Sequence, residues 1–152
     1  MKKNWQAIVL MLLLAITDTT FAQVKTRTLE NQYDDDMSSA SLTARNHAVM
    51  IVNDTALKTA GKIKYADIVL NNLEVRKKAY ESLKSSMSAT KKESTKNLDT
   101  VIEKNNANAI MLAIGLKAEL QKQKLDEAKL IDYSAKIVAS IDEMEKAHQA
   151  LK

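Results

Sequence analysis

The chain has no cysteine and no proline, and only two of its 152 residues are glycine. Without cysteine there are no disulfides, no cysteine nucleophiles and no cysteine metal sites. Without proline, and with glycine only at Gly61 and Gly115, the chain lacks the residues on which the tight turns of β-sheets depend. Ala, Leu, Lys, Glu and Gln, which favour helices, are abundant instead. We therefore predict an all-α protein.

The first 22 residues have the three-part layout of a secretory signal peptide. A basic start, MKKNWQ, precedes the apolar run AIVLMLLLAI, and TDTTFA ends in a small residue. The apolar run is too short to span a bilayer, which takes about 20 apolar residues. The signal is of the bacterial type, and we expect cleavage after Ala22. This export signal predicts a periplasmic or secreted protein. The alternative is an uncleaved N-terminal anchor.

Removal of residues 1–22 leaves 130 residues, enough for one domain with a modest core. Segment 23–36 has scattered apolar residues and three adjacent acids, and we predict a flexible N-terminal arm there. The rest, 37–152, is predicted to be a single helical bundle domain. Its predicted helices cover about 37–84, 95–124 and 126–151.

Apolar residues recur at three- and four-residue spacing, the pattern of a helix that buries one stripe. In the first predicted helix the stripe consists of Val49, Val52, Ala56, Ile63, Ala66, Leu70, Leu73, Tyr80 and Met87. A repeat of seven residues is typical of coiled-coil-like packing. We therefore expect an elongated helical hairpin or a three-helix bundle, with a kink or break near Gly61.

Residues Ala109 to Gly115 carry no polar side chain, although 28% of the chain is charged. A helix that is apolar on all sides over two turns is normally surrounded by other helices. We predict that this segment supplies a core or partner-contacting apolar face, with core packing favoured over an oligomer contact or insertion into lipid. Its residues are Ile110, Leu112, Ile114 and Leu116.

Positive charge is concentrated in residues 58–96, which hold ten bases and four acids. The predicted basic face consists of Lys77, Lys78, Lys91 and Lys92. Such a face can make weak contact with an anionic envelope surface or an acidic protein, or can simply be solvated. Export, and the scarcity of aromatic residues among the bases, argue against nucleic acid.

Residues that could carry chemistry are few. The acids Asp34 to Asp36 are adjacent and lack a nearby glycine, whereas calcium loops space their ligands around one. His47 and His148 have no second histidine or acid at ligand spacing, apart from Glu145 near His148. No serine lies in a glycine elbow. We predict no enzyme activity, metal, cofactor or small-molecule substrate.

Two threonines are candidate O-glycosylation sites. Thr55 lies in Asp-Thr-Ala and Thr100 in Asp-Thr-Val. Both tripeptides resemble the Asp-Thr-aliphatic signal that some Gram-negative bacteria use on exported proteins. The hypothesis requires that both side chains are exposed.

A signal peptide followed by cysteine-free, Lys-rich helices resembles two groups, the Skp-type periplasmic chaperones and the minor pilin subunits of type IV secretion and conjugation systems. The segment QVKTRTLENQY lacks the β-strand with which the chaperones begin. We expect a structural or interaction protein of the cell envelope, such as a component of a secretion or conjugation apparatus, that contacts a protein partner or itself. A holdase chaperone and a membrane-active helical protein are the alternatives.

Overall fold

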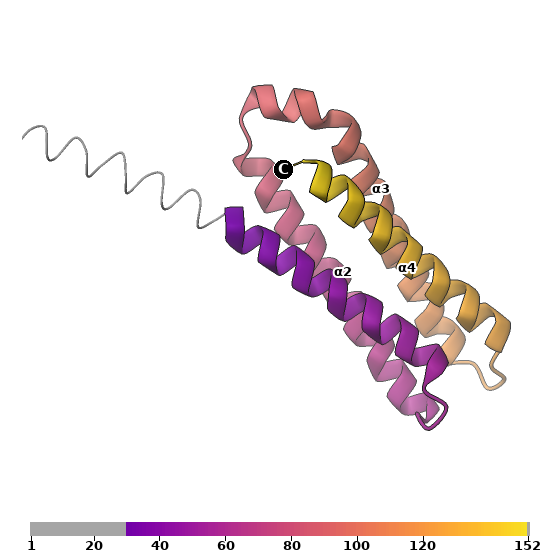
Figure 1. The fold of residues 1–152 in the computed structure, drawn as a ribbon. Coiled ribbons are helices and arrows are strands. Elements are labelled where there is room, and N and C mark those ends of the chain that lie inside the picture. The colour runs from indigo at the N-terminus through magenta and orange to yellow at the C-terminus, as the bar shows by residue number, and fades with distance from the viewer. Residues whose placement is uncertain (1–29, 152) are drawn as a thin grey trace, which may run out of the picture.

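The computed structural model describes residues 30–151, and these form four helices (Figure 1). The N-terminal helix covers residues 30–53, followed by α2 (Thr59–Ser86), α3 (Ala89–Leu120) and α4 (Glu127–Ala150). No strand occurs between residues 30 and 151, so the all-α prediction is confirmed. The predicted signal peptide and residues 23–29 of the predicted arm lie outside the described residues, whereas residues 30–36 of that arm are helical.

The three-helix prediction is wrong, because the segment predicted as one helix over 37–84 is two helices separated by residues 54–58. Asp54 accounts for the break. Its carboxylate accepts a hydrogen bond from the Ala56 amide at 3.0 Å, a local contact that competes with helical hydrogen bonding. Gly61, near which a break was predicted, lies in the first turn of α2.

Helix α3 begins at Ala89, before the predicted start near residue 95. Ser88 is its N-cap, and the hydroxyl oxygen accepts a hydrogen bond from the Lys91 amide at 3.2 Å. Further along, the Thr95 hydroxyl donates to the Lys91 carbonyl at 2.8 Å, a type of contact that often bends helices. In Figure 1 the start of α3 crosses the end of the bundle before the helix turns to run along it.

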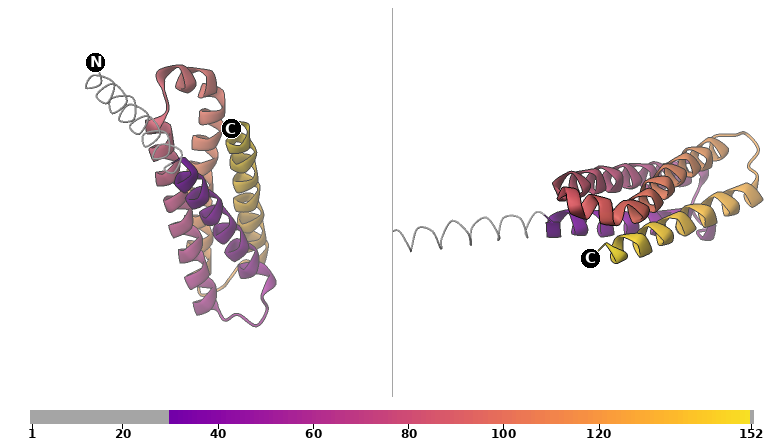
Figure 2. Two further views of the ribbon diagram at one scale, coloured as in Figure 1. Left: turned by 60° about the vertical axis from the view of Figure 1, so that its left-hand side comes forward. Right: turned by 90° about the horizontal axis from the view of Figure 1, so that it is seen from above.

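The start of α4 agrees with the prediction, since Asp126 is its N-cap and accepts a hydrogen bond from the Lys129 amide at 3.2 Å. Residues 121–126 connect α3 to α4, and the four helices run alternately in opposite directions (Figures 1 and 2). The N-terminal helix meets α4 where Ser41 donates to Glu145 at 2.6 Å, and α3 packs against both α2 and α4. The helices therefore close into one four-helix bundle.

Small residues occupy much of the core. Fully buried alanines come from the N-terminal helix, α2 and α3, namely Ala44, Ala48, Ala66, Ala109 and Ala113. Small side chains let neighbouring helix axes approach closely, and larger residues such as Leu73 and Ile137 fill the remaining space. The predicted stripe is wrong at its start, because Val49 is 38% exposed whereas Ile51 is fully buried.

The two glycines have different surroundings and should respond differently to alanine. A Cβ at Gly61 would lie 2.6 Å from Leu57 Cδ1, the movable end of a side chain. A Cβ at Gly115 would lie 2.8 Å from Cε1 of the Tyr133 ring. We expect Gly61→Ala to stabilise the protein by about 0.5 kcal/mol through helix propensity, and Gly115→Ala to destabilise it by about 1–2 kcal/mol through overpacking. Urea denaturation measures both, and a stabilised Gly115→Ala variant would contradict the tight contact.

Candidate functional site

The apolar run of α3 is core on one side and surface on the other. Ala109, Ala113 and Leu116 are fully buried, and Ile110 and Leu112 are half-buried against the same cluster. On the outer side Met111 is 72% exposed and Ile114 is 53% exposed. A helix turns about 100° per residue, so seven apolar residues point in all directions while the bundle covers only part of the helix.

The lysines of the predicted basic face come from two places. Lys77 and Lys78 lie in the middle of α2, where consecutive side chains point in different directions. Lys91 and Lys92 lie in the first turn of α3, and Lys92 Nζ donates to the Ser85 carbonyl at 3.3 Å. Of the ten bases in residues 58–96, Lys77 pairs with Glu81, Lys84 with Glu103, and the buried Arg76 with Glu145. Only part of the local positive charge is therefore balanced by ion pairs.

The two candidate glycosylation sites are both exposed but differ in setting. Thr55 lies in the connection between the N-terminal helix and α2, next to the turn made by Asp54. Thr100 lies within α3, and its hydroxyl donates to the Lys96 carbonyl at 2.9 Å. Thr55 is thus on irregular backbone, whereas the Thr100 hydroxyl is engaged with its own helix.

The histidines contact neighbouring helices. His148 is buried near the end of α4, and its Nε2 lies 2.9 Å from Asp34 Oδ1 of the N-terminal helix. His47 Nδ1 lies 2.8 Å from the Thr43 carbonyl oxygen, and the His47 ring meets Tyr65 edge-on. Among residues 30–151 no group of three or more His, Cys, Asp or Glu side chains is placed to hold a metal ion. Asp34, from the predicted acidic run, thus contacts the C-terminal helix.

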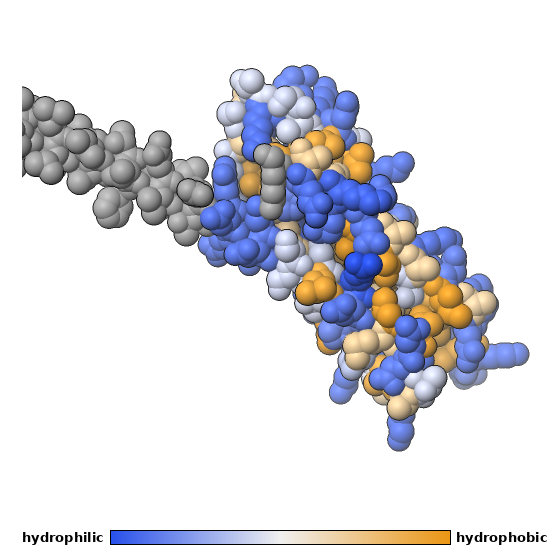
Figure 3. Space-filling model, viewed as in Figure 1, coloured by the Kyte–Doolittle hydropathy of each residue, from blue (hydrophilic) through white to orange (hydrophobic). Residues whose placement is uncertain are grey.

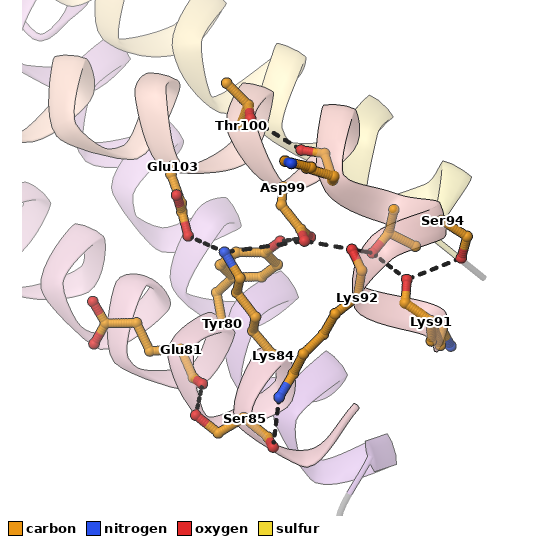
Figure 4. A network of polar contacts seen from close by, with 12 residues as sticks. Tyr80, Glu81, Lys84, Ser85, Lys91, Lys92, Ser94, Asp99, Thr100 and Glu103 are labelled. Carbon is orange, nitrogen blue, oxygen red and sulfur yellow. Dashed lines mark hydrogen bonds and ion pairs between the residues drawn. The ribbon is translucent and has the colours of Figure 1, made fainter. Parts of the chain in front are cut away.

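Figure 4 shows a polar network that joins α2 to α3. The Tyr80 hydroxyl donates to the Asp99 carboxylate, and both side chains are buried. Lys84 Nζ donates to Glu103 at 2.6 Å and lies 4.0 Å from Asp99 Oδ2, while the Thr95 hydroxyl lies 3.4 Å from the same oxygen. The buried carboxylate therefore has both hydrogen bonds and a nearby cation to offset its desolvation.

A pocket of about 220 Å³ opens beside this network, between α2 and α3. Its lining consists of Lys77, Tyr80, Glu81, Glu103, Asn106 and Ala107. Asn106 is 2% exposed, and its Oδ1 has no hydrogen-bond partner among the described residues. Buried polar atoms without a partner are rare, because the lost hydration is not replaced. The pocket and the network together form the candidate functional site.

Because of the Tyr80 hydroxyl, the stability of the fold should fall as the pH rises through the alkaline range. Burial, together with the hydrogen bond and charge of Asp99, raises the pKa of Tyr80 above its ordinary value of 10.0. An acid whose pKa rises on folding stabilises the folded state below its unfolded pKa. That contribution starts to disappear above about pH 10, where the unfolded chain ionises first.

We therefore expect the wild type to lose stability above about pH 10 more steeply than a Tyr80→Phe variant. Thermal denaturation of both proteins at a series of alkaline pH values measures the difference. Because the lysines are common to both proteins, their titration cancels in the comparison. Parallel curves would contradict the raised pKa of Tyr80.

No protein-family model, curated protein or solved structure matches the chain. None of the helices in residues 30–151 has the length and apolarity that crossing a membrane requires.

Proposed function

We propose that the protein is an exported bacterial component of the cell envelope that acts through protein contacts, as a structural or interaction part of an assembly such as a secretion or conjugation apparatus. The export step rests on the signal-like residues 1–22. The proposed protein contacts rest on one observation. The bundle exposes large apolar side chains that are not part of its own core.

Met111 and Ile114 are the centre of this surface. They are three residues apart and so lie on the same side of α3. Their exposure, 72% and 53%, contrasts with the complete burial of Ala109 and Ala113 in the same run. Neighbouring exposed apolar side chains are a common feature of protein interaction sites. The pair supports a protein partner or a second copy of the chain.

The distribution of apolar residues over the rest of the molecule agrees with this proposal. In Figure 3 the apolar residues on the visible face gather toward the end that holds the α3–α4 connection, and the opposite end is mostly hydrophilic. Of the exposed large apolar residues outside α3, Ile131 lies near the start of α4 and so next to this connection. An uneven distribution of this kind favours contact with partners at one end of the bundle.

Crosslinking in intact cells, followed by fractionation and identification of the crosslinked proteins, tests the proposal. We expect the tagged protein in the envelope fraction, joined to one or a few defined proteins or to itself. A broad set of outer-membrane proteins would support the holdase alternative instead, and leakage of liposomes by the purified protein would support the membrane-active one. Recovery in the cytoplasm without envelope contacts would overturn the proposal.

A further inference from the structure

We propose that the pocket between α2 and α3 binds a primary alkylammonium group. Asn106 is the central feature, since its side-chain oxygen is a buried acceptor that no donor of the described residues reaches. Glu81 of α2 and Glu103 of α3 line the same pocket and add two carboxylates. Acceptors on both helices of one pocket suit an ammonium ion, which presents only N–H donors.

The charges around the pocket favour a cation. Its lining contains two acids, Glu81 and Glu103, and one base, Lys77. The Lys77 ammonium lies 4.0 Å from Glu81, too far for a hydrogen bond, so Glu81 remains available to a ligand. Glu103 already accepts a hydrogen bond from Lys84, but a carboxylate has room for further donors.

The pocket also offers apolar surface for a short alkyl chain. Tyr80 and Ala107 belong to the lining. The Tyr80 hydroxyl is already engaged with Asp99, so this side chain contributes mainly its apolar ring. An alkylammonium group combines a cationic end for the acceptors with a chain for these walls.

Two sources can supply the group, a free aliphatic diamine or the lysine side chain of a protein partner. The first would add a small ligand to the protein. The second would give the proposed protein contact a specific anchor. Binding at the pocket does not require a contact at Met111 and Ile114, so either idea can fail while the other stands.

An NMR titration with n-butylammonium chloride, with sodium chloride at matched ionic strength and 1-butanol as controls, tests the inference. We expect saturable shifts of the Asn106 side-chain amide and of the Tyr80 and Glu103 backbone signals with n-butylammonium alone. Parallel titrations with 1,4-diaminobutane and with N-acetyl-lysine methylamide identify the source by whichever binds more tightly. If n-butylammonium causes no saturable shift of these NMR signals, or if 1-butanol causes an equal shift, the inference is overturned.

Substitutions sharpen the test. Asn106→Leu should abolish binding, and Glu81→Gln should weaken it about tenfold through the loss of a charged acceptor. Lys77→Gln should strengthen binding, because it removes the competing cation. Asn105→Leu is the matched control, since the Asn105 amide donates to the Val101 carbonyl at 2.9 Å and does not line the pocket.

Binding that persists unchanged in both Asn106→Leu and Glu81→Gln would contradict the site. If Asn106→Leu fails to fold, the affinity of Glu81→Gln for n-butylammonium provides the test. Glu81 is exposed, so its substitution removes charge at the rim of the pocket without disturbing the core. Unchanged affinity in Glu81→Gln would then overturn the inference.

Discussion

Replacing Ala113 with Asp should unfold the protein, whereas replacing the neighbouring Ile114 with Asp should change its stability by no more than about 0.5 kcal/mol. Ala113 is fully buried within the main core cluster, and Ile114 is 53% exposed. A carboxylate buried without a partner costs several kcal/mol, which is comparable to the whole stability of about 5–15 kcal/mol typical of a domain. Circular dichroism and thermal denaturation measure both effects.

Ala118→Asp is the matched control, because Ala118 is an exposed alanine on the same helix. We expect this variant to remain folded and to melt close to the wild type. If Ala113→Asp also melted close to the wild type, α3 could not face the core in the orientation described.

Replacing Glu145 with Ala should cost about 3 kcal/mol, more than replacing its partner Arg76 with Met, for which we expect about 1 kcal/mol. Arg76 is fully buried, and its guanidinium is held by Ser41 Oγ at 2.9 Å, Met144 Sδ at 3.2 Å and Glu145 Oε1 at 3.4 Å. Burial lowers the pKa of Arg76, and the nearby Glu145 carboxylate opposes that change. Without Glu145 the buried cation loses the charge that compensates its desolvation.

The asymmetry follows from the different exposure of the two partners. The Glu145 side chain is 28% exposed, so it can remain hydrated when Arg76 is replaced by an apolar side chain of similar length. The double variant Arg76→Met, Glu145→Ala should be more stable than Glu145→Ala alone. Urea denaturation of the three variants provides the comparison, and a milder effect for Glu145→Ala than for Arg76→Met would contradict it.

Composition was enough to predict the all-α class, and one local signal, the N-cap Asp126, located the start of α4. The break falls at 54–58 and not near Gly61, because Asp54 and Thr55 form a more effective turn signal than the glycine. The predicted start of α3 is too late, because serines and threonines are typical of a connection as well as of a helix start. In the structure Ser88 caps the helix, and Thr95 bonds back onto it.

The candidate site was not predicted, although the sequence holds a signal for it. Asp99 and Asn106 lie three residues before and four residues after the buried Ile102, so both occupy core positions of α3. Arg76 likewise lies three residues after the buried Leu73. Polar residues at such positions indicate buried networks, but the partners, Tyr80 for Asp99 and Glu145 for Arg76, depend on helix packing and could not be found from spacing alone.

The apolar run of α3 shows a second limit of pattern reasoning. Of the four large residues predicted to form its apolar face, only Leu116 is fully buried, and Ala109 and Ala113 are buried with it in the core. Close packing of helices selects small residues for the tightest contacts, so the largest apolar residues of a run need not be the most buried. This leaves Met111 and Ile114 at the surface, where the proposed function needs them.

Photo-crosslinking in living cells tests the central claim, that this surface contacts a protein, most directly. A photoreactive amino acid would replace Met111 in one variant and Val75, an exposed apolar residue on α2, in the other. We predict that position 111 yields a defined adduct with an envelope protein or a second copy of the chain, and that Ile114→Asp abolishes it. Equal or no adducts from positions 111 and 75, or an adduct insensitive to Ile114→Asp, would contradict the account.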